Sequence, residues 1–109
     1  MGYRFADAIK PAAVTDFENV LMRLKQALLS SADPVRRSQA AGWKIFKAAE
    51  PGPNGSVLYV FVMDPAVKGA NYAVARILAE AYPEEALSLY RLYNGAFAAG
   101  QTMLNLEPR

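Results

Sequence analysis

The sequence predicts a single α+β domain in which the elements follow the order strand, helix, strand, strand, broken helix, strand. Three observations carry this prediction. An apolar pattern of helical spacing follows a short N-terminal strand, two apolar strands flank a turn rich in proline and glycine, and Pro83 interrupts a second helical stretch. A chain of 109 residues with 53% hydrophobic content is long enough for one domain with its own core.

The first predicted strand covers residues 3–10 (YRFADAIK) and leads almost directly into a helix. Because side chains alternate across a sheet, Tyr3, Phe5 and Ile9 are expected to share one face of this strand. Asp7 has the same parity as these three residues. It therefore interrupts an otherwise apolar face.

The first predicted helix covers residues 16–30, after Pro11 has ended the strand. Thr15 and Glu18 have the spacing of a capping box, in which two side chains satisfy free backbone N–H groups at the start of a helix. Apolar residues then recur at helical spacing and are expected to face the core: Phe17, Val20, Leu21, Leu24 and Leu28.

A short second piece of helix is predicted from Asp33-Pro34 through Gln39. Aspartate favours the capping position, and proline suits the first helical residue because its fixed φ is already helical. Gly42 is expected to end this helix in a left-handed conformation. Asp33 and Gly42 thus mark its two predicted ends.

The next two predicted strands, residues 43–49 and 56–63, form an antiparallel hairpin. The intervening residues 50–55 contain two prolines and two glycines, which is typical of a turn. Residues 56–63 (SVLYVFVM) are rich in β-branched and aromatic side chains and give the clearest strand signal in the chain.

The C-terminal half predicts a helix over residues 71–82, a break at Pro83 and a further helix that begins at Glu84 and Glu85. The apolar stripe of this further helix consists of Leu89, Tyr93, Ala96 and Phe97. Residues 102–106 predict a last, short strand. The complete order is that of a ferredoxin-like domain, with a four-stranded antiparallel sheet and its helices on one face.

The third predicted strand is apolar on both sides, whereas a half-exposed antiparallel strand should alternate apolar with polar residues. Leu58, Val60 and Val62 are expected to face the helices. The aromatic side is then expected to face outward and to be covered by a second copy of the chain, since two-fold dimers are the commonest assembly. The predicted dimer interface consists of Trp43, Val57, Tyr59, Phe61 and Met63.

Composition excludes several chemistries. The chain has no cysteine and no histidine, which excludes disulfides, thiolate nucleophiles, histidine-bound haem or zinc, and a Ser-His-Asp triad. We expect no metal and no cofactor. No apolar run approaches a membrane span, so we expect a soluble domain, either cytoplasmic or exported after removal of a signal.

Two surface patterns leave alternatives open. Arg36 and Arg37, with Lys44 and Lys47, could hold an anion, although a solvated rim is the plainer interpretation. The six tyrosines suggest core packing or, alternatively, a pocket of phenols for a planar apolar ligand.

The chain resembles the dimeric α+β barrel superfamily, which includes antibiotic-biosynthesis monooxygenase-like and stress-response domains. The resemblance rests on the element order, on Gly42-Trp43 at the start of the second strand and on the doubly apolar third strand. Residues 49–65 are also similar to small uncharacterised bacterial proteins. The resemblance implies that two open sheet faces pack together and that each subunit has a ligand pocket between sheet and helices. Candidate pocket residues are Phe17, Phe46, Tyr72, Tyr90, Tyr93 and Asn94.

The superfamily also implies an enzymatic alternative. Its cofactor-free monooxygenases oxidise aromatic substrates with scattered polar and aromatic side chains. Residues of suitable type here are Trp43, Asn71, Tyr72, Arg76 and Asn94. A second alternative is RNA binding, because RNA-recognition domains stack bases on sheet aromatics placed as Tyr59 and Phe61 are. The third strand has no lysine or arginine, so nucleic acid is the less favoured partner.

Overall fold

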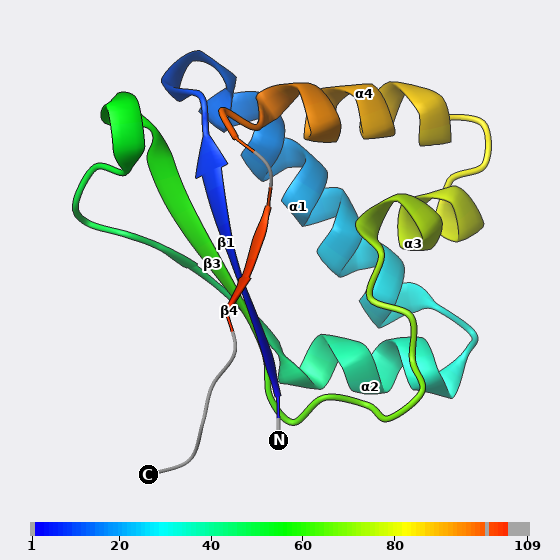
Figure 1. Ribbon diagram of the computed structural model, residues 1–109. Helices are drawn as coiled ribbons and strands as arrows, with labels where there is room; N and C mark the ends of the chain where they lie inside the picture. The colour runs from blue at the N-terminus through cyan, green and yellow to red at the C-terminus, as the bar shows by residue number, and fades with distance from the viewer. Residues whose placement is uncertain (1, 100, 105–109) are drawn as a thin grey trace, which may run out of the picture.

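The computed structural model describes residues 2–99 and 101–104 and confirms the α+β class. Within this part of the chain, four helices pack against an antiparallel sheet (Figure 1). Their bounds are β1 Tyr3–Ile9, α1 Val14–Ser30, α2 Pro34–Gly42, β2 Trp43–Lys47, β3 Val57–Met63, α3 Val74–Ala81, α4 Ala86–Ala96 and β4 Thr102–Leu104. The predicted end of the last strand, residues 105–106, lies outside the described residues.

The sheet is built around β3, which pairs antiparallel with β2 on one side and with β1 on the other. Phe61 lies opposite Phe5 of β1 and opposite Ile45 of β2, which fixes the register of the three strands. The short β4 pairs antiparallel with the start of β1. All four helices lie on one side of the sheet, and no described element covers the other side (Figure 1).

Helix α1 begins earlier than predicted, and the predicted capping box is wrong. The helix starts at Val14, and a 3-10 turn over Pro11–Ala13 leads into it. Thr15 therefore lies inside the first turn, where its side chain cannot cap the helix. The fixed φ of Pro11 starts helical geometry about one turn ahead of the capping signal. The predicted core face is confirmed, since Phe17 and Leu24 are buried.

The Asp33 cap of α2 is confirmed, because its Oδ1 accepts a hydrogen bond of 2.9 Å from the Val35 N–H. The helix runs on to Gly42, whose predicted left-handed conformation is wrong. Glycine is required there for another reason. A Cβ atom on Gly42 would lie 2.4 Å from the Pro65 carbonyl oxygen, so any side chain would collide with the segment that follows β3.

The break in the C-terminal helical region is confirmed, since α3 ends at Ala81 and α4 begins at Ala86. Helix α3 starts at Val74, later than predicted. The Asn71 side chain explains the delay, because its Oδ1 accepts a 2.8 Å hydrogen bond from the Ala73 N–H and forms a local turn. Strand β2 also ends at Lys47, two residues before its predicted end.

The predicted orientation of β3 is wrong. Tyr59, Phe61 and Met63 are almost fully buried beneath the helices, at 1–3% exposure. Leu58, Val60 and Val62 instead lie half-buried on the uncovered side. The larger aromatic side chains fill the deep space under α1, where Phe17 packs against the rings of Tyr59 and Phe61. Burying the larger set removes more apolar surface from water.

Candidate ligand cavity

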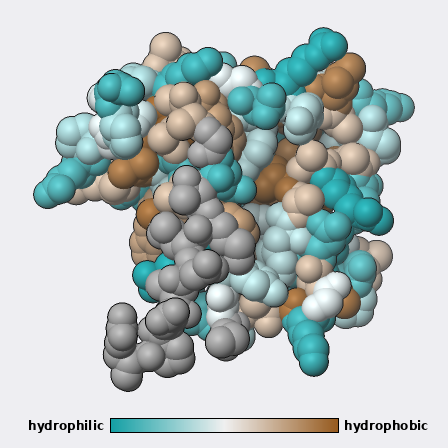
Figure 2. Space-filling model, viewed as in Figure 1, coloured by the Kyte–Doolittle hydropathy of each residue, from teal (hydrophilic) through white to brown (hydrophobic). Residues whose placement is uncertain are grey.

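A cavity of about 210 Å³ lies between the sheet and the segments that carry α3 and α4. Three strands supply its floor, the residues just before and within α3 supply one wall, and α4 and the residue before β4 supply the other. Its principal lining side chains are Phe5, Trp43, Phe61, Met63, Tyr72, Tyr93 and Gln101. Figure 2 shows the molecule from the same side as Figure 1, and apolar surface is visible near the middle of this view.

Aromatic rings form one corner of the cavity. The ring of Trp43 lies 5.4 Å from that of Tyr72 and 6.0 Å from that of Phe61, measured between centroids. Both pairs are tilted or edge-to-face, as aromatic rings prefer. The Trp43 indole N–H is buried and has no hydrogen-bond partner among residues 2–99 and 101–104. The corner therefore presents flat apolar surfaces to the cavity, and its unpartnered donor has no accessible surface there.

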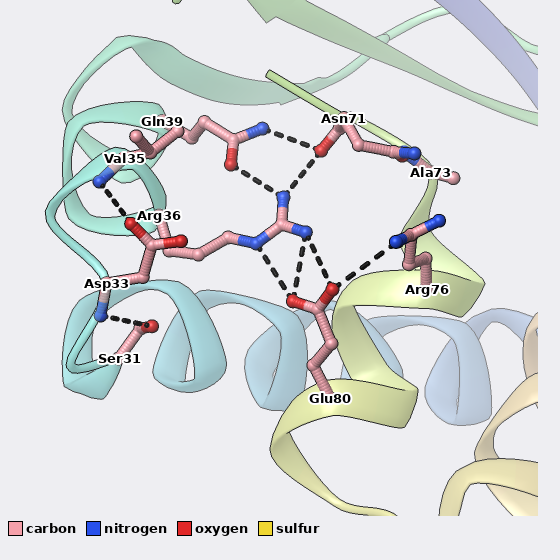
Figure 3. Close-up of polar contacts among 9 residues, drawn as sticks. All are labelled: Ser31, Asp33, Val35, Arg36, Gln39, Asn71, Ala73, Arg76 and Glu80. Atoms are coloured by element: carbon pink, nitrogen blue, oxygen red, sulfur yellow. Dashed lines mark hydrogen bonds and ion pairs between the residues drawn. The ribbon is translucent and has the colours of Figure 1, made fainter.

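The Tyr72 wall is held in place by a polar network around Arg36, shown in Figure 3. The Arg36 guanidinium donates to the Asn71 carbonyl oxygen at 2.6 Å, to Gln39 Oε1 at 2.7 Å and to the carboxylate of Glu80 at 3.0 Å. Gln39, which is fully buried, also donates to the Asn71 carbonyl. The network ties α2, α3 and the segment before α3 together next to Tyr72.

The contacts of these cations also argue against the interpretation that Arg36, Arg37, Lys44 and Lys47 hold an anion. Arg36 is already surrounded by acceptors of its own chain, and Arg37 donates to the Ser31 carbonyl oxygen at 2.6 Å. Lys47 lies 3.5 Å from the carboxylate of Glu18. Lys44 lies on the opposite side of the sheet from the helices, by strand alternation. The four cations do not gather into an anion site.

A buried carboxyl group lies behind the other wall. Asp7 is completely buried on the helix-facing side of β1, where its Oδ1 accepts a 2.7 Å hydrogen bond from Gln101 Nε2. Its Oδ2 has no hydrogen-bond partner in the described part of the chain. Burial raises the pKa of Asp7 to about 6, while the hydrogen bond from Gln101 acts in the opposite direction.

Tyr93 and Gln101 connect the cavity to the surface. Both also line a second, more open hollow of about 410 Å³, together with Asn94 and Phe97. The pKa of Tyr93 is raised, first by burial and second by the negative charge of Asp7, so its hydroxyl stays protonated at neutral pH. Tyr93 and Gln101 thus form the wall shared by the two spaces, and Asp7 lies under it.

The six candidate pocket residues lie in different parts of the structure, and only two of them line the cavity. Tyr72 and Tyr93 line the cavity, and Asn94 lines only the outer hollow. Phe17 is completely buried in the core, and Tyr90 is 43% exposed on α4. Phe46 as a pocket residue is wrong: it is 54% exposed and lies on the uncovered side, because its parity on β2 is opposite to that of Trp43.

The interface predicted from the outward aromatic side requires correction. Trp43, Tyr59, Phe61 and Met63 are buried beneath the helices, and Val57 packs against the same core. None of these five residues belongs to the uncovered sheet face. Tyr59 and Phe61 are consequently unavailable for stacking on RNA bases.

Two residues of the site were missed as functional candidates. Asp7 gave a signal, because it is an acid at a core-facing position of a strand. Gln101 gave none, because it reaches Asp7 across 94 residues of sequence through the pairing of β4 with β1.

Comparisons with protein-family models, with curated proteins and with solved structures find no significant match to this chain. Among the described residues, no group of three or more acidic side chains comes together that could hold a metal ion. None of the helices in this part of the chain is long and apolar enough to cross a membrane.

Proposed function

We propose that this chain binds a small, planar, largely apolar molecule in the cavity between its sheet and α3 and α4. The observation that carries the proposal is the aromatic lining of this space, where Trp43, Tyr72 and Phe61 present rings around a volume of about 210 Å³. An apolar cavity of about 150 Å³ is sufficient to bind benzene. The size therefore favours a molecule of one or two rings.

The polar groups of the lining support a ligand rather than a filled core. Ligand sites typically combine apolar walls with a few polar groups that fix orientation. Here Gln101 and Tyr93 add an amide and a hydroxyl group to the apolar lining. A cavity that served only as a packing defect would have no need of them.

The single tryptophan supplies a direct test, because the protein gives one indole N–H signal in a ¹H–¹⁵N spectrum and Trp43 lines the cavity. Titration with p-xylene should shift this signal in a saturable manner. Ala75→Leu, which adds bulk at the cavity lining, should weaken binding by about tenfold. Ala79→Leu is the matched control, since this exposed alanine of α3 lies outside the lining.

Two results would contradict the proposal. The first is a Trp43 signal that does not move up to the solubility limit of p-xylene. The second is equal binding by the wild type and by Ala75→Leu, which would locate the ligand elsewhere.

Binding is favoured over the oxygenase alternative, because most polar candidates for that chemistry do not reach the cavity. The Asn71 side chain is used in a local turn, and Arg76 is exposed and contacts Glu80. Asn94 lines only the outer hollow. Only Trp43 and Tyr72 of that set line the cavity.

We also propose that the uncovered face of the sheet pairs with the same face of a second copy. We call this surface the open face; by strand register it consists of Arg4, Ala6, Ala8, Lys44, Phe46, Leu58, Val60 and Val62. Six of these eight residues are apolar, and none is acidic. With β4 beside β1, the strand order β2-β3-β1-β4 supports a ferredoxin-like sheet, and paired faces would give a dimeric α+β barrel.

Charge indicates how the copies would be arranged. Arg4 and Lys44 both lie opposite Val62, so both cations lie at one end of the open face. A two-fold axis that lies in the interface between the two sheets and crosses β3 at right angles near the central Val60 places the cationic ends of the two copies at opposite ends of the interface. This arrangement buries the apolar rows and separates the like charges.

Light scattering coupled to size exclusion tests this pairing. Wild type should have the mass of a dimer, and Val60→Asp should have that of a monomer, because it would bury two unpaired carboxylates close to the axis. Leu87→Asp is the control, since Leu87 is 61% exposed on α4, away from the sheet. A monomeric wild type, or a dimeric Val60→Asp, would refute pairing through the open face.

A further inference from the structure

The Asp7 carboxyl group is buried, and most of its capacity to accept hydrogen bonds is unused by the residues that the structure describes. It is 0% exposed, and it lies between the core-facing residues Phe5 and Ile9 of β1. An ionised carboxyl group has about four sites for hydrogen-bond donors. In the described part of the chain only Gln101 occupies one, at Oδ1, and Oδ2 has no partner.

Such a group lowers the stability of the folded protein unless a further hydrogen-bond donor reaches it. A buried acceptor without a hydrogen-bond partner destabilises the folded state, and it does so more strongly when it is charged. Packing alone would favour an apolar residue at this position, because the neighbours of Asp7 on the same face of β1, Phe5 and Ile9, are both apolar. A buried acid with an unsatisfied oxygen next to a cavity is a candidate for a functional site.

The one donor that Asp7 has is also the most easily displaced part of the wall. The Gln101 side chain donates one hydrogen bond to Asp7 and interacts with the Tyr93 hydroxyl, and the residue itself is exposed. Gln101 lines both the cavity and the outer hollow, so it lies where a molecule would pass from one to the other. Movement of its amide would uncover the carboxyl group to the cavity.

We infer that Asp7 is the recognition group of the cavity, and that the ligand is an aromatic molecule with an O–H or N–H group that displaces Gln101 and donates its hydrogen bond to Asp7. This inference rests on the proposed function and narrows it to a chemical class, such as phenols and arylamines. The ring lies against the aromatic corner at Trp43 and Tyr72, and the donor points to β1. A ring without a donor enters the same space and leaves Gln101 on Asp7.

Two probes of nearly equal shape test this inference, since p-cresol replaces one methyl group of p-xylene with a hydroxyl. Without an acceptor in the cavity, p-xylene would bind better, because the hydroxyl of p-cresol would lose its hydrogen bonds to water. With Asp7 as acceptor, wild type should bind p-cresol about tenfold more tightly than p-xylene, as expected for a hydrogen bond to a charged group. The Trp43 indole signal reports both titrations.

Two variants assign the preference to Asp7. Asp7→Leu should retain p-xylene binding and lose the preference for p-cresol. Gln101→Ala removes the competing donor from an exposed position, and so it should increase the preference for p-cresol over p-xylene several-fold. Because Gln101 is exposed, the second variant tests the inference even if Asp7→Leu does not fold.

The outcomes separate this inference from the proposed function. Equal binding of the two probes by the wild type, or a preference that survives in Asp7→Leu, overturns the role of Asp7 and leaves the cavity as a binding site. A smaller preference for p-cresol over p-xylene in Gln101→Ala also overturns it, because Gln101 would then be the recognition group. If neither probe binds the wild type, the proposed function itself is wrong.

Discussion

We expect the free energy of unfolding of Asp7→Asn, relative to that of the wild type, to increase with pH. The variant should compare more favourably with the wild type at pH 8 than at pH 4. The pKa of Asp7 is about 6 in the folded protein, against an ordinary value of 3.8. The folded state therefore holds the proton more tightly than the unfolded state does. As pH rises from about 4 to above 6, the wild type must ionise a buried carboxyl group, and its free energy of unfolding falls.

The size of the effect follows from the pKa difference. A difference of about 2 pKa units corresponds to about 3 kcal/mol at about 1.4 kcal/mol per unit. About 2–3 kcal/mol of this falls between pH 4 and pH 8, because the unfolded carboxyl group is already partly ionised at pH 4. Asparagine does not titrate, so the variant escapes this loss, although its buried amide has a fixed cost of about 1–2 kcal/mol.

Urea unfolding at one-unit steps between pH 4 and pH 8, followed by Trp43 fluorescence, measures the difference. Glu18 loses stabilisation as pH falls, because a hydrogen bond from Tyr59 lowers its pKa, but this contribution is common to both proteins and cancels. Asp7→Leu is the control: its fixed cost differs, yet the pH-dependent part must be the same. A stability difference that does not change with pH would refute the raised pKa of Asp7.

Two further pairs of variants test the frame around the cavity by urea unfolding. Arg36→Met should lower the free energy of unfolding by about 2–3 kcal/mol, because it leaves buried polar groups without their donor. Arg76→Met, at the exposed end of the same network, should lower it by about 0.5 kcal/mol or less. Equal effects of the two substitutions would show that the network is not structural. Gly42→Ala should destabilise by about 2–4 kcal/mol, since its Cβ would lie 2.4 Å from the Pro65 carbonyl oxygen. Gly95→Ala in α4 meets nothing within 4 Å and should stabilise by about 0.5–1 kcal/mol; a tolerated alanine at Gly42 would contradict the close approach.

Local patterns in the sequence predicted the elements, because each depends on a few neighbouring residues. The apolar face of α1, the Asp33 cap and the break at Pro83 are of this kind. The early start of α1 was missed, since proline and a capping box competed over the same turn, and Pro11 prevailed.

The orientation of the sheet could not be read from β3, which is apolar on both sides. Its neighbour holds the information: Arg4, Ala6 and Ala8 of β1 form a face with a charge and small side chains, and Phe5 lies opposite Phe61. Only the pairing of the two strands connects the faces, and pairing is a tertiary property. The size of the aromatic side chains then decides which side the helices cover.

The candidate site was only partly visible for the same reason. Tyr72 and Tyr93 were candidates because aromatic residues cluster in the C-terminal half. The contact between Asp7 and Gln101 joins the two ends of the described chain and depends on β4 lying beside β1. No local pattern encodes such a contact.

The two walls of the cavity differ in stiffness. On one side, the Val67 N–H donates to the Tyr72 hydroxyl at 2.8 Å, and Arg36 and Gln39 hold the adjacent Asn71 carbonyl. On the other, the exposed Gln101 is joined to Asp7 by one hydrogen bond. The proposed ligand is therefore expected to enter and leave past Gln101. Its residence time should depend on how often the hydrogen bond between Gln101 and Asp7 breaks. For the ligand that we propose, the Tyr72 side is the fixed wall that its shape has to match.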